Sequence, residues 1–155
     1  MKNKLLSIIV PAYNVEKYLS KTVKSLGVFL NCEEVEIVII NDGSTDCTFR
    51  VAKKLGKEYQ NIEIIDKKNS GLSAVRNFGN KVAQGEYIYF FDGDDYLNEE
   101  YTSEIMNELK KRKFDLYCLG YVKVDAQGRK ISSHVYDVDK KYSRVDYVEF
   151  IKSLV

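Results

Sequence analysis

The chain of 155 residues is 45% hydrophobic and 30% charged, which excludes a disordered tail and a coiled-coil rod and predicts a single domain, 1–155. Its 24 Lys and Arg residues nearly balance 23 Asp and Glu residues, so the net charge of +1 gives no general attraction for nucleic acid or an anionic membrane. No apolar run approaches the roughly 18 residues that a membrane-spanning helix needs.

Four short apolar runs predict the strands of a buried sheet. They are rich in apolar and β-branched residues and lie at residues 5–10, 35–40, 62–65 and 87–91. Nearly continuous apolar runs are typical of strands that are covered on both faces, as in a parallel sheet. Pro11, the only proline, is expected to end the first strand, because proline cannot donate a hydrogen bond to a neighbouring strand.

Apolar residues at helical spacing follow each of these runs. The spacing predicts helices over residues 15–30, 51–59, 75–82 and 101–109. Asn14 and Asn98 are placed to cap the first and the last of them. The basic run at 110–113 lies at the end of the last helix, where it complements the helix dipole, and a membrane-surface patch is the less favoured alternative.

The pattern changes after these helices. A strand beginning at Phe114 is expected to turn near 125–128 and return toward Val138, and a final helix to cover 147–154. The preceding alternation predicts a doubly wound α/β/α sandwich with a mainly parallel central sheet. Ligands on such sheets bind outside the carboxyl ends of the strands. Those ends carry the polar segments at 11–14, 41–44, 67–71 and 92–95.

The segment from Asp92 to Asp95 has three carboxylates in four residues. Like charges this close repel one another, and a hard divalent cation with oxygen ligands, such as Mg²⁺ or Mn²⁺, would offset the repulsion. Gly93 would let the backbone turn sharply or approach a ligand. The same residues also fit an acidic turn in which Asp95 or Asn98 caps the next helix.

Three further side chains have both a structural and a functional interpretation. Asp42 is either a turn residue or an acceptor for a ligand N–H. Arg76 forms either a surface ion pair or a fork that binds phosphate. Tyr13 either packs normally or offers a face on which a base stacks. Neither Gly-x-Gly-x-x-Gly nor a phosphate loop nor a serine nucleophile elbow is present, which disfavours dehydrogenases, P-loop NTPases and triad hydrolases.

Taken together, four segments resemble the family 2 glycosyltransferases with the GT-A fold. In chain order they read SIIVPAYN at 7–14, EIVIINDGSTD at 36–46, NSGLSAVRN at 69–77 and GEYIYFFDGDD at 85–95. The resemblance implies a GT-A-like, Rossmann-like domain that binds a nucleotide-sugar donor, commonly a UDP-sugar, with Mn²⁺ or Mg²⁺. Residues 1–97 would form the nucleotide-sugar-binding core and residues 98–155 the start of the acceptor-side region.

The resemblance also implies roles for individual residues. The nucleoside pocket would be lined by Pro11, Ala12 and Tyr13. Asp42 would contact the base, and Gly71 and Arg76 would border the donor site. Asp92, Gly93 and Asp94 form the Asp-x-Asp motif of the family: Asp92 would lie near the ribose and the metal, and Asp94 would be the main protein ligand of the metal.

The chain departs from the family in lacking a recognisable catalytic base. Inverting members take a carboxylate base from the acceptor-binding half, well downstream of the Asp-x-Asp motif. The downstream acids considered are Asp125, Asp137, Asp139 and Asp146. Nothing in the sequence marks any of them as a base, so the catalytic residue is unassigned. We expect the chain to be the donor-binding half of a longer enzyme or a natural short form.

The cellular context is expected to be cytoplasmic. Cys32, Cys47 and Cys118 are spaced as neither a zinc site nor a redox pair, His134 is the only histidine, and no signal-peptide cleavage site precedes the first strand. The resemblance adds a saccharide or lipid-linked acceptor, synthesis of cell-envelope polysaccharide and peripheral association with the inner membrane face. The alternatives are a non-catalytic nucleotide-sugar-binding or assembly module and, more remotely, a receiver-type phosphoacceptor domain.

Overall fold

The computed structural model describes residues 4–111, 116–125 and 127–135. The chain divides into two compact units, Met1–Lys113 and Phe114–Val155. No helix in the described part of the chain is both long and apolar enough to cross a bilayer. The predicted return strand is present as far as the described residues reach, whereas its expected end near Val138 and the predicted helix at 147–154 lie outside them.

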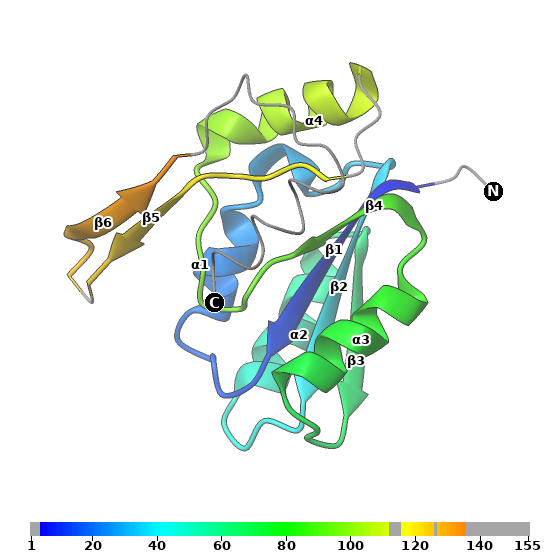
Figure 1. Ribbon diagram of the computed structural model, residues 1–155. Coiled ribbons are helices and arrows are strands. Elements are labelled where there is room, and N and C mark those ends of the chain that lie inside the picture. The colour runs from blue at the N-terminus through cyan, green and yellow to red at the C-terminus, as the bar shows by residue number, and fades with distance from the viewer. Residues whose placement is uncertain (1–3, 112–115, 126, 136–155) are drawn as a thin grey trace. The chain divides into compact units, whose positions relative to one another are not determined.

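The first unit is built on a four-stranded parallel sheet (Figure 1). The strands are β1 (Lys4–Ala12), β2 (Val35–Asp42), β3 (Ile62–Lys67) and β4 (Gly85–Phe90). Their order is β3-β2-β1-β4, and each neighbouring pair is parallel. The strands β1 and β2 occupy the centre, which explains why their residues are almost entirely buried and mostly apolar.

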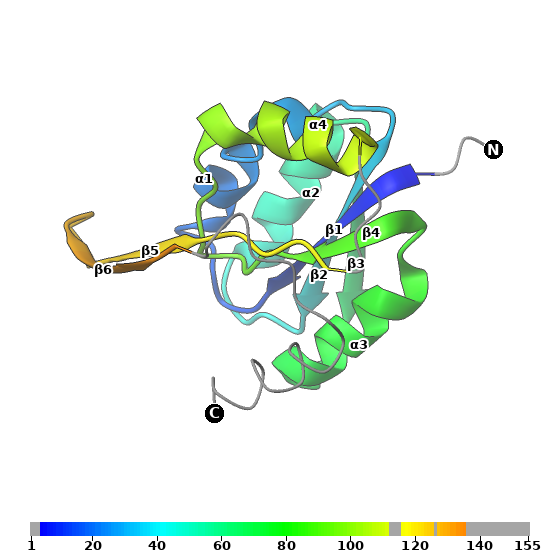
Figure 2. The same cartoon turned by 45° about the horizontal axis from the view of Figure 1, so that its top comes forward.

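Helices cover both faces of this sheet, as a doubly wound fold requires. They are α1 (Leu19–Lys24), η1 (Gly27–Phe29), α2 (Thr48–Glu58), α3 (Leu72–Val82), η2 (Glu99–Tyr101) and α4 (Thr102–Lys111). Figure 2 shows α3 on one side of the sheet and α1, α2 and α4 on the other. The predicted sandwich with a parallel central sheet is therefore confirmed.

The interface between α3 and the sheet is tightly packed. Ile9, Val38 and Ile40 of the central strands pack with Val75 of α3 in one buried cluster. Gly79 faces the same surface, and a Cβ atom built on it would lie 2.4 Å from Cγ2 of Ile9. Glycine is therefore needed here because the helix backbone approaches the sheet too closely for a side chain.

Replacing Gly79 with alanine is expected to destabilise the first unit by about 1–3 kcal/mol, the usual cost of overpacking a tight core. The added methyl group has no space unless α3 moves away from Ile9. The measurement is the free energy of unfolding in urea, with Asn80→Ala on the exposed face of the same helix as the control. An unchanged free energy for the Gly79 variant would contradict the contact.

Two local predictions for the first crossover were wrong. Pro11 does not end β1 but pairs with Ile40 inside it. Ile9 accepts a hydrogen bond from the Phe91 N–H, so the backbone of Pro11, two residues on, faces the β4 side, where that strand has ended. Asn14 does not cap α1, which begins at Leu19 without a side-chain cap. Asn14 instead adopts φ +53°.

At the other end of the unit, the predicted cap was confirmed. The side chain of Asn98 accepts a hydrogen bond from the Glu100 N–H at 3.1 Å, at the start of η2. Lys110 of the basic run is paired with Glu34 at the surface of the same unit. That pairing agrees with the interpretation of the run as a solvated helix end.

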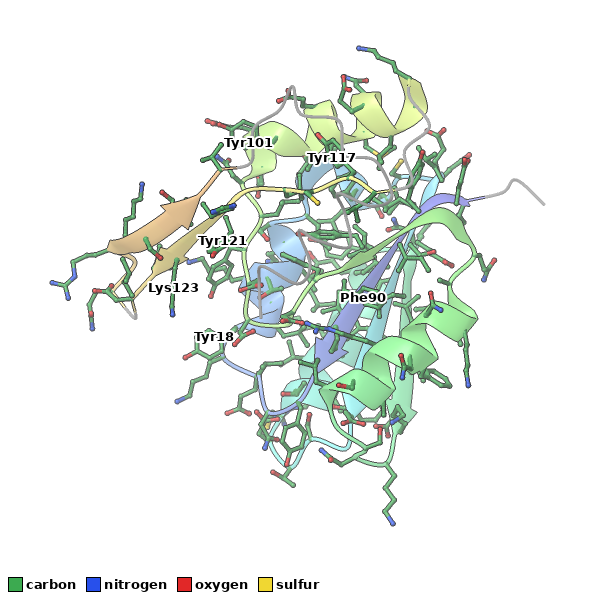
Figure 3. The ribbon with its side chains drawn as sticks, in the orientation of Figure 1. Tyr18, Phe90, Tyr101, Tyr117, Tyr121 and Lys123 are labelled. Carbon is green, nitrogen blue, oxygen red and sulfur yellow. The ribbon has the colours of Figure 1, made fainter. Side chains whose placement is uncertain are left out.

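Phe90 marks an exposed edge of the sheet (Figure 3). It lies beside Ile9 in the β1–β4 ladder, and its neighbour on the same strand face, Ile88, lies beside Ser7. Both apolar side chains are partly exposed. Among the described residues of this unit no strand lies beyond β4.

The second unit contains a short antiparallel hairpin. It is formed by β5 (Tyr121–Val124) and β6 (Lys130–His134), with Tyr121 beside His134. The predicted turn near 125–128 is confirmed, because the Gly128 N–H donates to the Asp125 carbonyl at 2.9 Å. Figure 3 labels Tyr121 and Lys123, which alternate with Val122 and Val124 along β5.

Candidate functional site

The carboxyl ends of the parallel strands bring the predicted site segments to one edge of the sheet (Figure 1). Tyr13 follows β1 with half of its surface exposed, and Asp42 ends β2. Gly71 lies after β3 and caps α3, and Asp92 follows β4. This convergence follows from parallel pairing, because every strand of such a sheet ends at the same edge.

Reciprocal hydrogen bonds join the loop after β1 to the loop after β2. The side-chain oxygen of Asn14 accepts from the Thr45 N–H at 2.9 Å. Glu16 accepts from the Cys47 N–H at 2.7 Å, and its own N–H donates to Asp46 at 3.2 Å. Asp46 thus joins the two loops, and it also accepts a hydrogen bond from the Thr48 N–H at the start of α2. These bonds hold the backbone that follows Tyr13 against the loop after β2.

Asp42 is buried, with a side chain 4% exposed. Its carboxylate accepts the backbone N–H groups of Ser70, at 3.0 and 3.1 Å, and of Gly71, at 2.9 Å. It also accepts from the Ser70 hydroxyl and forms an ion pair with Lys67 at 2.9 Å. The interpretation of Asp42 as a simple turn residue is therefore wrong. Its carboxylate binds the loop after β3 and not the backbone of its own turn.

The surroundings of Asp42 favour the charged form of its carboxylate. Burial raises the pKa of Asp42, but the hydrogen bonds from Lys67, Ser70 and Gly71 together outweigh burial and lower it below its ordinary value of 3.8. Hydrogen bonds to the ionised form act in this direction because protonation would remove acceptors that the loop uses.

Folding stability should therefore depend on pH through Asp42. An acid whose pKa is depressed by folding stabilises the native state fully above its unfolded pKa of 3.8, and loses that contribution as the pH falls through the folded value. Urea unfolding at pH 5.5 and pH 3 should show a smaller loss of stability in Asp42→Asn than in the unchanged chain. Equal losses in the two proteins would contradict this assignment.

Arg76 connects α3 to the segment after β4. Its Nη2 atom donates to both carboxylate oxygens of Asp92, at 2.8 and 3.0 Å. The two side chains are 40% and 37% exposed, so the pair lies at the surface, where ion pairs contribute little stability. The Nε atom of Arg76 is buried and has no hydrogen-bond partner in the described part of the chain. A donor is thus still available beside the paired carboxylate.

Gly93 lies directly against the end of β1. A Cβ atom on Gly93 would lie 2.8 Å from the Pro11 carbonyl oxygen and 3.2 Å from the Val15 side chain. The Gly93 carbonyl accepts from the hydroxyl of Thr22, a buried residue of α1, at 3.0 Å. The acidic segment is therefore held between β1 and α1, and its glycine is required by close approach.

Alanine at position 93 is expected to displace the acidic segment. The methyl group meets the backbone of Pro11, which cannot move without disturbing β1. We expect a loss of about 1–3 kcal/mol in unfolding free energy, as for other overpacked sites. Urea unfolding measures it, and Asp95→Ala, an exposed change in the same segment, is the control. A fully stable Gly93 variant with unchanged Asp92 chemical shifts would contradict this contact.

The carboxylates of the acidic segment have different environments. Asp94 is exposed, whereas Asp92 is half-buried beside Arg76. Burial and the charges of Asp92 and Asp94 raise the pKa of Asp95. Burial, with the charges of Asp95 and Asp92 nearby, also raises the pKa of Tyr89 to about 12. The segment thus concentrates negative charge at the end of β4.

This donor set fits a hard cation only if other ligands complete the shell. No group of three or more His, Cys, Asp or Glu side chains in the described residues has the arrangement of a metal site. Mg²⁺ and Mn²⁺ commonly bind one or two carboxylates and complete the shell with water and substrate phosphate oxygens. Asp92 and Asp94 supply oxygen ligands of that kind and number.

In the sequence, Lys67 lies in a polar segment at a strand end but is not singled out as a site residue. Lys67 lies beside Asp42 in the β2–β3 ladder, so the ion pair depends on the strand register. The signal available in the sequence was the opposite charge of two residues that end neighbouring predicted strands. Asn14 was likewise identified only as a cap, although its side chain bridges two loops of the site.

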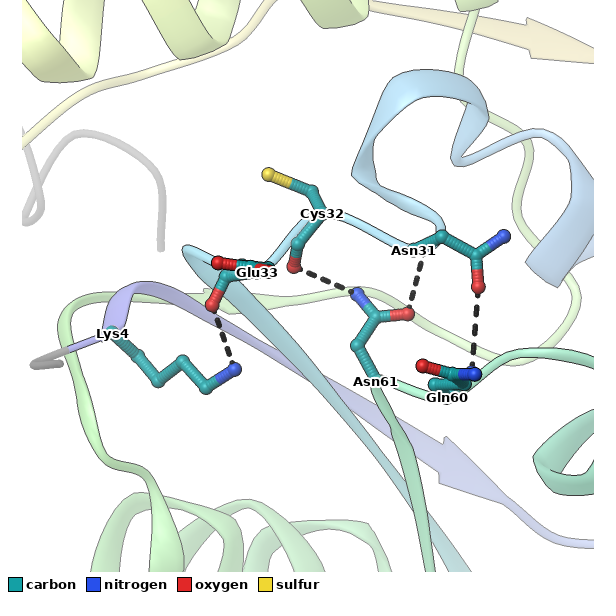
Figure 4. A pocket seen from close by; sticks show the side chains of 6 residues that line it. All are labelled: Lys4, Asn31, Cys32, Glu33, Gln60 and Asn61. Carbon is teal, nitrogen blue, oxygen red and sulfur yellow. Dashed lines mark hydrogen bonds between the residues drawn. The ribbon is translucent and has the colours of Figure 1, made fainter. Parts of the chain in front are cut away.

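A polar pocket lies at the opposite edge of the sheet (Figure 4). Its volume is about 420 Å³, and its lining residues are Lys4, Asn31, Cys32, Glu33, Gln60 and Asn61. The side-chain amide of Asn61 donates to the carbonyls of Phe29 and Cys32, at 2.8 and 3.4 Å, and accepts from the Asn31 N–H. These polar groups are used within the fold, so the pocket is a poorer candidate than the carboxyl edge.

Of the acids considered as a base, only Asp125 lies within the described residues. It accepts the N–H groups of Gln127 and Arg129, each at 2.9 Å, and pairs with the Arg129 side chain at 2.7 Å. The bonds from Arg129 and Gln127 hold the pKa of Asp125 below its usual range. Such a carboxylate is a weak base and is used in the hairpin turn, so it gains no support as a catalytic residue.

The comparison that decides the family covers most of the chain. Residues 7–150 match the family model described as Glycosyl transferase family 2. The chain belongs to this family. The prediction made from the four sequence segments is therefore confirmed, and the family assigns the chain to the glycosyltransferases.

Relatives within family 2 are much longer than this chain. The uncharacterized glycosyltransferase EpsJ of Bacillus subtilis is 32% identical over 148 residues, which are 96% of this chain and 43% of EpsJ. The poly(ribitol-phosphate) beta-glucosyltransferase of Bacillus spizizenii is 35% identical over 121 residues, 76% of this chain and 19% of that enzyme. The chain thus spans less than half the length of either relative.

A solved family structure supports the fold. TarS 1-349 of S. aureus, in complex with UDP-GlcNAc, matches with a TM-score of 0.59 and 34% identity. The match covers 66% of this chain and 30% of the TarS chain. Together with the parallel sheet, it confirms the GT-A-like α/β fold that the sequence predicts.

Proposed function

We propose that this chain is the donor-binding part of a glycosyltransferase that transfers a sugar from a nucleotide-diphospho-sugar, most simply a UDP-sugar, to an acceptor hydroxyl. The observation that carries the proposal is the convergence of four family segments on the carboxyl edge of one sheet. TarS has the same fold, is 34% identical to this chain over the matched part, and was solved in complex with UDP-GlcNAc. Residues 1–97 hold the binding core, and 98–155 begin the acceptor side.

The nucleoside half of the donor is assigned to the ends of β1 and β2. Pro11 and Ala12 form the floor, and the exposed ring of Tyr13 offers a face for the base. Asp42 is the acceptor for a base N–H, an assignment supported by the hydrogen bonds that lower the pKa of its carboxyl group and favour the ionised form. Gly71, whose φ is +86°, starts α3 at the border of this pocket.

The diphosphate half is assigned to α3 and the acidic segment. Arg76 has a buried Nε donor that the described protein groups leave without a partner, which is a suitable donor for an anionic oxygen. Asp92 and Asp94 would hold Mn²⁺ or Mg²⁺. A bound cation supplies positive charge that offsets the charge growing on the departing diphosphate.

The acceptor reaction is proposed to proceed with inversion, using a carboxylate base that is not assigned to a residue. The base removes the proton from the acceptor hydroxyl as its oxygen attacks the anomeric carbon and the bond to the nucleoside diphosphate breaks. We also propose a saccharide or lipid-linked acceptor in cell-envelope synthesis at the cytoplasmic membrane face. The name of the poly(ribitol-phosphate) relative supports only a glycosyl transfer that involves a polymer. A non-catalytic nucleotide-sugar-binding module is the second candidate, favoured by the engagement of Asp125 in its turn.

The proposal is tested by thermal unfolding with UDP, with and without Mn²⁺, and with GDP as the comparison nucleotide. Ligand at about 100 times its dissociation constant adds roughly 2.7 kcal/mol, which raises the midpoint by about 5–10 °C for a domain of this size. We expect a metal-dependent rise with UDP. No rise with either nucleotide would contradict the proposed donor site. Sugar transfer by the chain itself would exclude the non-catalytic alternative.

A further inference from the structure

Lys67 occupies a position at the candidate site to which no role has been given. It ends β3 directly beside Asp42 of β2 in the parallel ladder. Its ammonium group lies 2.9 Å from the Asp42 carboxylate, and the two side chains are 21% and 4% exposed. An ion pair this well shielded from water is screened far less than one at the surface.

The same ammonium group also closes the loop that follows β3. It donates to the Lys68 carbonyl at 3.2 Å and contacts the Ser70 hydroxyl. The Asp42 carboxylate accepts the N–H groups of Ser70 and Gly71 from the other side. Lys67 and Asp42 thus hold the loop between them. Each side chain also neutralises the shielded charge of the other.

This arrangement determines where α3 begins. Gly71 precedes the first residue of the helix, and its N–H is one of the two backbone donors held by Asp42. Arg76 follows within the next turns of α3 and pairs with Asp92 at the end of β4. A rigid helix therefore connects the Lys67–Asp42 pair with the acidic segment.

We propose that Lys67 is a positioning residue for the nucleotide, which acts by holding Asp42 and the loop at 67–71 in the conformation that receives the base. The inference rests on the proposed function of the same site. Without the ammonium group, the loop must be ordered when the nucleotide arrives, and that ordering subtracts from affinity. In the alternative role, Lys67 competes with the base of the nucleotide for Asp42. That role predicts tighter nucleotide binding when the charge of Lys67 is removed.

The observations favour positioning over competition. Competition requires the ammonium group to leave easily, but it makes two contacts within the loop, to Lys68 and Ser70, in addition to its ion pair with Asp42. The second carboxylate oxygen of Asp42 accepts only the two backbone N–H groups, so it is the less crowded place for a ligand donor to join.

The test uses the full 155-residue chain and three variants. Lys67→Met keeps the aliphatic stem and removes the charge, Lys67→Arg restores a cation, and Lys68→Met removes an exposed charge from the same loop as the matched control. UDP affinity is measured by calorimetry with Mg²⁺. Hydrogen exchange at the Ser70 and Gly71 amides is measured without nucleotide, with the amides of β2 as a check on folding.

We expect Lys67→Met to weaken UDP binding about tenfold and to accelerate exchange at Ser70 and Gly71, with unchanged exchange in β2. Lys67→Arg should recover most of both effects, and Lys68→Met should show neither. Equal or tighter UDP binding by Lys67→Met, or the same loss in Lys68→Met, would overturn the positioning role. Absence of UDP binding by the unchanged chain would instead refute the proposed function, and this role with it.

Discussion

Replacing Asp94 with asparagine is expected to abolish the metal-dependent part of UDP binding while leaving the fold intact. Asp94 is exposed at the end of the acidic segment, so the change removes a negative oxygen without opening a cavity. No group of three or more acidic, histidine or cysteine side chains in the described residues is arranged to hold a metal ion, so no preformed site would take over the role of Asp94. The roughly 2.7 kcal/mol that nucleotide at 100 times its dissociation constant adds in the presence of metal should be lost.

Thermal unfolding with UDP and Mn²⁺ measures this effect, and the midpoint without ligand shows whether the fold is unchanged. Glu100→Gln removes an exposed carboxylate from the nearby η2 and serves as the matched control. It should retain the full metal-dependent rise. If Asp94→Asn also retained it, the assigned role of Asp94 as the main metal ligand would be wrong.

Replacing Asp42 with alanine should produce the largest loss of stability in the first unit. The change leaves the Lys67 ammonium and the backbone N–H groups of Ser70 and Gly71 without their acceptor in a shielded position. Removing one partner of a buried ion pair typically costs about 3–5 kcal/mol. The nucleotide site should be lost as well, because the start of α3 is no longer fixed.

Urea unfolding measures this loss, with Glu63→Gln on the exposed part of β3 as the control. Asp42→Asn keeps the shape of the side chain and one acceptor oxygen, so its stability should lie between those of the unchanged chain and Asp42→Ala. A loss below about 1 kcal/mol in Asp42→Ala, the value of an exposed pair, would contradict the buried network.

The sequence predicted the fold because the fold depends on local patterns. Each buried strand is a short apolar run, and each helix has apolar residues at helical spacing. Parallel pairing then placed the polar strand ends together without knowledge of any contact. The family segments added the expectation that this edge binds a nucleotide-sugar donor, which composition and spacing alone left undecided.

The details that were missed depend on register and on close approach. Pro11 could continue β1 because its nitrogen faces the β4 side, where β4 has already ended. That outcome depends on the lengths of the two strands. Asn14 left the cap position because its side chain reaches a loop about 30 residues away. Lys67 pairs with Asp42 only in the register that the two strands adopt. Single-sequence patterns carry no information on such long-range geometry.

The most direct test of the donor site at the carboxyl edge is a map of amide chemical shifts on addition of UDP with Mg²⁺ to the isotope-labelled chain. The account predicts that the largest changes occur at Tyr13, Gly71 and Gly93, at the ends of β1, β3 and β4. Changes confined to Asn31 and Asn61, in the pocket at the opposite edge, or no changes at saturating nucleotide would contradict it.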